Sequence, residues 1–210
     1  MDASEIRSQS QILIESLGYP FNSNLPILDH IKLSRTPDEI AGRILALNAC
    51  VACSYGFPRN GALAWLEQEE IGQYLSNNED EYLQGRGVAK QATLQWHVEA
   101  LWALTWASGY HGNLDFSTSC SNDLVSILPN LKINESSITF RQSCTPRSVE
   151  EIARMLDIAY CLHWAVRHLR LQGRHSDTNT RIPDQIIIER RRGLEWLVGD
   201  EDWDSVPLDT

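Results

Sequence analysis

The sequence predicts an all-α protein, a single-domain irregular bundle of about six to eight helices spanning residues 1–210. Apolar residues recur at helical spacing through most of the chain. Capping residues precede these apolar segments and glycines follow them. The apolar and charged fractions are ordinary for a folded domain, and the chain contains no internal repeat and no low-complexity tract.

The first half of the chain predicts four helices. The second of them has the clearest start, because Thr36 can cap it and Pro37 suits its first turn. Asp38 and Glu39 favour the positive end of the same helix dipole, and Gly18 ends the first helix. The expected ranges are 4–18, 36–56, 61–75 and 76–106, the last broken near Gly85–Gly87, with a proline-punctuated connector over 19–33.

The second half begins with an irregular segment over about 109–147, where Gly, Asn, Ser and Pro are frequent. Within it, residues 136–142 alternate enough to predict a lone strand or one arm of a short hairpin. The best helix in the chain follows near 148–172, with Thr145 or Ser148 as its cap. It is apolar nearly all round, which marks it as the central helix of the bundle.

The last helix is expected over 183–199, and a C-terminal tail over 199–210 follows it directly. This tail carries three apolar side chains, whose exposure to water is unfavourable: Trp203, Val206 and Leu208. We therefore expect the tail to dock on the bundle.

The net charge of −10 limits the partners. Nucleic acid and anionic membranes repel an acidic protein, so neither is expected as the main partner, whereas a basic protein is attracted. The sequence shows no signal peptide, and no apolar run approaches the roughly 20 residues that cross a bilayer. We therefore expect a soluble, cytoplasmic protein.

Five cysteines are present, and an odd number argues against a fully paired disulfide framework. Cys50 and Cys53 form a C-x-x-C pair, but a structural metal would need two further ligands, and no second such motif accompanies them. We expect these cysteines to act as small buried hydrophobic residues, and we expect no metal and no cofactor.

Two carboxylates lie on apolar helix faces. Glu99 shares a helical stripe with Trp96 and Trp106, and Asp157 shares one with Tyr160. An ionised carboxylate is not buried without a partner, because the loss of its hydration costs several kcal/mol. Both acids are therefore expected to have cationic partners.

Arginines on other helices are the expected partners. Arg43 borders the apolar stripe of the second helix, and Arg190 and Arg191 interrupt apolar rows of the last helix. We predict that Glu99 and Asp157 pair with two of these three arginines inside the bundle. Such a network either fixes helix register or, with the tryptophans, lines a ligand pocket. The candidates for this polar core or pocket are Arg43, Trp96, Glu99, Trp102, Asp157, Tyr160, His163, Trp164, Arg190, Arg191 and Trp203.

An enzymatic role would rest on Glu99 and His163 as an acid–base pair. The chain contains no nucleophile elbow, no glycine-rich phosphate loop and no H-E-x-x-H motif. His97 and Glu99 form an H-x-E sequence, but the P-C-x-x-C of zinc deaminases does not follow. His97 points off the tryptophan stripe and is expected to be exposed. No catalytic residue is assigned.

Three blocks of the chain resemble the bacterial domain-of-unknown-function family 4272. They are WHVEALWALTWA, EIARMLDIAYCLHWAVRHLRLQG and ERRRGLEWLVGDEDWDSVPLDT. The residues that match the family pattern are Glu39, Ile40 and Arg43, Trp96, Glu99, Ala100 and Trp102 to Leu104, Asp157, Tyr160 and His163 to Ala165, Arg190 to Leu197, and Trp203 to Thr210. The resemblance spans nearly the whole chain and is weakest in the middle segment. It implies a helical fold and no established activity.

Two stretches of the chain, 60–85 and 199–210, are acidic and contain no lysine or arginine. Acidic surfaces attract basic partners, so the chain is predicted to be a non-enzymatic protein-binding module. The most specific form of this prediction is an immunity or antitoxin protein that neutralises a cognate toxin in bacterial competition. The partner-facing candidates are Glu67, Glu69, Glu70, Glu79, Asp80, Glu81, Asp200, Glu201 and Asp202.

Two alternatives stand beside this prediction. One is a small-ligand binding or sensing domain with a tryptophan-lined interior. The other is an enzyme that uses Glu99 and His163.

Overall fold

The computed structural model confirms the all-α class and describes residues 2–86, 91–173 and 183–210, among which every regular element is a helix. The longer helices are α1 (Ala3–Ser16), α2 (Pro37–Ser54), α3 (Arg59–Gln68), α5 (Gln91–Ala107), α8 (Val149–Leu171) and α9 (Asp184–Val198). The shorter helices are α4 (Asn77–Leu83), α6 (Leu124–Ile127) and α7 (Ile138–Ser143), and the 3-10 turns are η1 (Gly72–Tyr74), η2 (Leu131–Ile133) and η3 (Trp203–Ser205).

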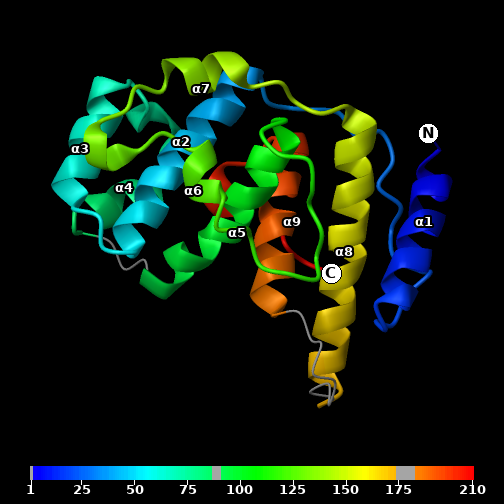
Figure 1. The fold of residues 1–210 in the computed structure, drawn as a ribbon. Coiled ribbons are helices and arrows are strands. Elements are labelled where there is room, and N and C mark those ends of the chain that lie inside the picture. The colour runs from blue at the N-terminus through cyan, green and yellow to red at the C-terminus, as the bar shows by residue number, and fades with distance from the viewer. Residues whose placement is uncertain (1, 87–90, 174–182) are drawn as a thin grey trace.

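The longer helices lie side by side in a row across the molecule (Figure 1). Along this row α1 packs on α8, α8 on α9, α9 on α5, and α5 on α2. The helices α3 and α7 contact the far side of α2, and α4 contacts both α2 and α3. Because α8 is covered on one side by α1 and on another by α9, apolar residues occupy most of its circumference.

Capping boxes fix the starts of three helices. In each, a serine or threonine oxygen accepts a hydrogen bond from the N–H three residues on, and the acid at that position accepts one from the N–H of the cap residue. The pairs are Thr36 with Glu39, Ser76 with Glu79, and Ser148 with Glu151. Of the two caps predicted for α8, the structure therefore uses Ser148.

The hairpin arm predicted over 136–142 is wrong, because this segment contains the start of helix α7. Phe140 is its buried residue, and the ring of Tyr110 stacks on Phe140 with centroids 4.2 Å apart. The Tyr110 hydroxyl also donates to the Phe140 carbonyl at 2.6 Å. A single aromatic anchor suits a short helix, whereas a strand would bury alternate residues and Ile138 is 61% exposed.

The third helix is shorter than predicted and ends at Gln68 rather than near residue 75. Glu70 has a φ of 58°, a left-handed conformation that no helix continues through, and η1 follows it. This turn brings Tyr74 against α2 at Gly42, where an added Cβ would lie 2.4 Å from the Tyr74 ring. Gly42 therefore allows η1 to sit directly on α2.

Candidate functional site

Glu99 and Arg190 form a buried ion pair between α5 and α9. Arg190 Nε and Nη2 donate to Glu99 Oε2 at 2.9 and 2.6 Å, and both residues are 1% exposed. Glu99 Oε1 also accepts from the Cys120 N–H at 3.0 Å, and Arg190 donates to the carbonyls of Asp115 and Thr118. The pair therefore fixes the loop after α5 against the helices and is closed to solvent.

Asp157 pairs with Arg7 of α1, and not with Arg43, Arg190 or Arg191 as predicted. Arg7 is 7% exposed and Asp157 2% exposed. Burial by itself lowers the pKa of Arg7, but the hydrogen bond with Asp157 raises it, and the net direction is upward. The guanidinium therefore stays charged, and this second buried pair joins α1 to α8.

Arg43 pairs with Glu79 at the start of α4. Glu79 is 1% exposed, so its predicted place on a partner-facing surface is wrong. It is the acid of the Ser76 capping box, and that position turns its side chain back toward α2. A second Arg43 donor reaches the Tyr74 carbonyl at 2.7 Å.

Arg191 joins α9 to α8 and to the end of the chain. Its Nη1 lies 2.8 Å from His163 Nδ1, and its Nε and Nη2 contact Glu195 at 3.0 and 2.9 Å. It also donates to the Asp209 carbonyl at 3.2 Å, and its guanidinium lies 4.7 Å from the centre of the Tyr160 ring. Burial first and the charge of Arg191 second lower the pKa of His163 to about 4, so this imidazole is neutral at pH 7 and accepts from Arg191.

Glu99 and His163, the predicted acid–base pair, are thus each engaged by a different arginine of α9. Among the described residues, no group of three or more His, Cys, Asp or Glu side chains is placed to hold a metal ion. No helix in this part of the chain is both long enough and apolar enough to cross a membrane.

The predicted tryptophans do not gather around Glu99. Trp96 is 38% exposed, Trp102 stacks on His111 at 3.5 Å between ring centroids, and Trp164 stacks on His168 at 4.6 Å. His97, which was predicted to be exposed, is 8% exposed. The predicted stripe is therefore buried at Glu99 and Trp106, which are 1% and 5% exposed, but not at Trp96.

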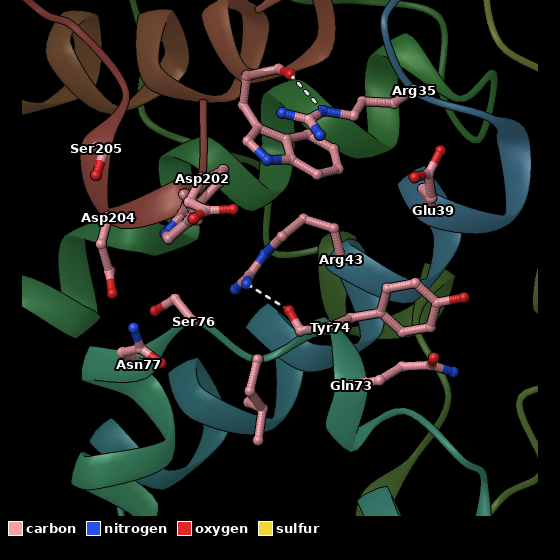
Figure 2. Close-up of a pocket in the computed structure, with 13 residues that line it drawn as sticks. Arg35, Glu39, Arg43, Gln73, Tyr74, Ser76, Asn77, Asp202, Asp204 and Ser205 are labelled. Atoms are coloured by element: carbon pink, nitrogen blue, oxygen red, sulfur yellow. Dashed lines mark hydrogen bonds between the residues drawn. The ribbon is translucent and has the colours of Figure 1, made fainter. Parts of the chain in front are cut away.

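A cavity of about 400 Å³ lies between the start of α2, η1 and the chain after α9. We call it the tail cavity, and its lining consists of Arg35, Glu39, Arg43, residues 73–77, Trp196 and residues 202–205. Figure 2 shows Arg35 and Arg43 extending into it from one side, with Asp202 and Asp204 on the facing side. Trp203, a predicted pocket residue, therefore does line a cavity, although not the predicted one.

Each of the two arginines lies over an indole ring. The Arg35 guanidinium is 4.8 Å from the Trp196 ring centre, and that of Arg43 is 4.7 Å from the Trp203 ring centre. Arg35 donates to the carbonyls of Trp196 at 3.2 Å and Glu201 at 2.7 Å, so it also holds the turn that follows α9. These cation–π contacts keep both guanidinium groups facing the tail cavity.

Two donors of cavity-lining residues, Arg43 Nε and Trp203 Nε1, are buried and have no hydrogen-bond partner among the described residues. His97 Nδ1 is also buried without a hydrogen-bond partner among the described residues, and the His97 and Trp203 ring centroids are 6.0 Å apart. A buried donor without an acceptor costs roughly 1–3 kcal/mol, so Arg43 Nε and Trp203 Nε1 are sites where an incoming acceptor would be favoured.

The two acidic stretches meet at the mouth of the tail cavity. Asp204 Oδ2 accepts from the Asn78 N–H at 3.0 Å, which ties the chain after α9 to the start of α4. Glu69 instead accepts from the Ser137 N–H at 2.8 Å and is half-buried, and Asp80 is also half-buried. The other partner-facing candidates, which are exposed, are Glu67, Glu70, Glu81, Asp200, Glu201 and Asp202.

Arg7 and Arg35 are the site residues that the sequence analysis missed. Arg7 stands among serines and glutamines, which are typical of a solvated helix face. Its spacing to Ser10 and Ile14 is i, i+3, i+7, and all three residues are buried. The burial of Arg7 could therefore have been predicted from helical periodicity. Arg35 lies in the connector before α2, where periodicity carries no information.

The family model described as Domain of unknown function (DUF4272) matches residues 6–206. No curated protein and no solved structure matches the chain.

Proposed function

The chain belongs to the DUF4272 family, and we propose that it is a non-enzymatic acidic module that binds a basic protein partner. The observation that supports this most is the hydrogen bond between Asp204 and Asn78, which brings the two base-free acidic stretches to one face. Exposed carboxylates of Glu81, Asp202 and Asp204 then belong to neighbouring segments. We call this the acidic face.

The negative charge of the acidic face determines which kind of partner it attracts. With a net charge of −10, further anions are repelled by the molecule as a whole, whereas a basic surface gains attraction at long range. Such steering mainly raises the association rate and weakens as salt shortens the range of the field. A partner of this kind therefore binds more tightly at low salt.

The most specific form of the proposal is an immunity or antitoxin protein that neutralises a cognate toxin in bacterial competition. A toxin that acts on nucleic acid carries a basic surface for its own substrate. An acidic module could cover that surface, and the size and charge of the chain are what support this version.

The test uses basic proteins encoded by the genes next to this one, with binding measured by calorimetry at low and high salt. The double variant Glu81→Lys/Asp202→Lys reverses two exposed charges on the acidic face and is expected to weaken binding at least about tenfold. Glu5→Lys/Glu15→Lys makes the same change in net charge on exposed residues of α1, at the other end of the row, and should have a much smaller effect. Equal losses in both variants, or no binding to any of these proteins, would contradict the proposal.

A second candidate function is small-ligand binding in the tail cavity. It is favoured by one observation, that two arginines and the indoles of Trp196 and Trp203 line the same space of about 400 Å³. Ligand-dependent shifts of the melting temperature across a metabolite library, lost on Arg35→Gln, would support it.

A further inference from the structure

The tail cavity has cations along one wall and carboxylates at its rim. Arg43 is 2% exposed and is matched by the carboxylate of Glu79. Arg35 donates hydrogen bonds to two carbonyls, those of Trp196 and Glu201. On the facing side stand the exposed carboxylates of Asp202 and Asp204 (Figure 2).

A cation does not suit the inner part of this cavity. The indole rings of Trp196 and Trp203 are the surfaces that would receive it, and Arg35 and Arg43 already occupy them. A third positive charge there would be repelled by both guanidinium groups. A cationic group is favoured only at the rim, beside Asp202 and Asp204.

An oxygen acceptor does suit the inner part. Arg43 Nε and Trp203 Nε1 are donors without acceptors among the described residues, and both belong to the lining. The Trp203 ring covers the Arg43 guanidinium, so an acceptor reaches these atoms when η3 moves outward. That movement would break the Asp204–Asn78 hydrogen bond and the edge contacts of the Trp203 ring with His97 and Trp196.

A simple anion is disfavoured by the same arrangement. The anion would be attracted by Arg35. It would also be repelled by the two carboxylates at the rim and by Glu39, which lines the cavity as well. A ligand that carries both an oxygen acceptor and a cation meets hydrogen-bond donors in the inner part of the cavity and carboxylates at its rim.

We propose that the tail cavity binds a small group in which an ammonium lies close to an oxygen acceptor, as in an α-amino acid or in the amino-terminal residue of a polypeptide. This rests on the second candidate function, that the cavity takes a small ligand. The acceptor contacts Arg35, Arg43 and the Trp203 indole N–H, and the ammonium group contacts the carboxylates of Asp202 and Asp204.

The experiment compares four probes at equal millimolar concentrations by thermal shift and by calorimetry: glycine, glycinamide, acetate and methylammonium. Glycine is expected to raise the melting temperature, whereas acetate, which lacks the ammonium group, and methylammonium, which lacks the oxygen acceptor, are not. If glycinamide binds as well as glycine, the natural ligand is a polypeptide amino terminus. If glycine alone binds, it is a free amino acid.

Arg35→Gln and Asp202→Asn are each expected to weaken glycine binding about tenfold, the loss of one charge-assisted contact. Arg59→Gln is the matched control, because its guanidinium also lies over an aromatic ring, 4.3 Å from the centre of Tyr82, but it does not line the cavity. Asp202 is exposed, so Asp202→Asn keeps the test valid even if Arg35→Gln fails to fold.

Two results overturn the inference. One is that none of the four probes binds to the folded protein. The other is that acetate binds as tightly as glycine, with no loss on Asp202→Asn. A metabolite that lacks either the ammonium group or the oxygen acceptor but binds, and loses affinity on Arg35→Gln, would overturn this ligand class while the ligand-binding function stands.

Discussion

Arg7 and Asp157, separated by 150 positions in the sequence, form a two-pronged ion pair between α1 and α8. Arg7 Nε lies 3.1 Å from each carboxylate oxygen, and Nη2 lies 2.8 Å from Oδ1. The same guanidinium donates to the carbonyls of Leu25 and Pro26 at 2.9 and 2.7 Å. One arginine therefore fixes the first helix, the connector behind it and α8 in a single arrangement.

Asp157→Asn is expected to lower the free energy of unfolding by about 3–5 kcal/mol, because it leaves the buried Arg7 without its counter-charge. Urea denaturation measures this loss. Replacing both partners, as Arg7→Met with Asp157→Leu, should recover most of it, since no buried charge is then unpaired. Asp29→Asn is the exposed control, with a side chain 71% exposed. An unchanged stability of Asp157→Asn would show that the pair contributes nothing.

Glu99→Gln is expected to cost a similar amount, about 3–5 kcal/mol, since Arg190 loses its carboxylate inside the core. Because Glu99 and Arg190 also hold the backbone at Cys120, Asp115 and Thr118, the loop after α5 should exchange its amide hydrogens faster. Hydrogen exchange detects this change. Glu67→Gln, on the exposed surface, should alter neither quantity.

Gly42→Ala should destabilise the protein by about 1–3 kcal/mol through overpacking. The new Cβ would lie 2.4 Å from the Tyr74 ring, so η1 must move away from α2. Gly72→Ala is the matched control in η1 itself, because nothing lies within 4 Å of a Cβ added there. If thermal denaturation ranks the two variants equally, η1 is not held as tightly as the structure indicates.

His163 should make the protein less stable as the pH falls from about 6.5 to about 4. Its pKa is lowered from 6.5 to about 4 in the folded chain, so in this window the unfolded chain binds a proton that the folded chain does not. The decrease in the free energy of unfolding approaches about 3 kcal/mol near pH 4 and is absent above about pH 6.5. His163→Gln should flatten the curve of stability against pH, whereas His30→Gln, at an exposed position, should leave it unchanged. Parallel curves for all three proteins would refute the assignment.

Deletion of residues 203–210 should lower the melting temperature by several degrees or more. Trp203 is 3% exposed and Val206 8% exposed, so the deletion uncovers the apolar surface beneath them and frees Arg43 from the Trp203 ring. Loss of a buried tryptophan side chain alone costs about 3–5 kcal/mol. Pro207→Ala, at an exposed position of the same segment, should have little effect. Differential scanning calorimetry compares the three proteins.

Much of the fold could be predicted from local sequence, because a helix start depends on residues within one turn of each other. Thr36 and Glu39 show this, since the residue that caps α2 and the acid that completes the capping box are three positions apart. The segment over 136–142 shows the opposite case. Its alternation predicts a strand, but Phe140 has a stacking partner, Tyr110, that lies 30 positions away.

The sequence by itself determined most of the longer helices, the cap of α2 and the need for buried acids to find cationic partners. Only the tertiary structure decided which partners these are, because a partner is set by which helix faces meet and how deeply they are covered. Thus Asp157 meets Arg7 rather than an arginine of α9, and Glu79 turns inward to Arg43. The tail cavity has the same origin, since its walls come from segments more than a hundred positions apart that the Asp204–Asn78 contact, across 126 positions, holds together.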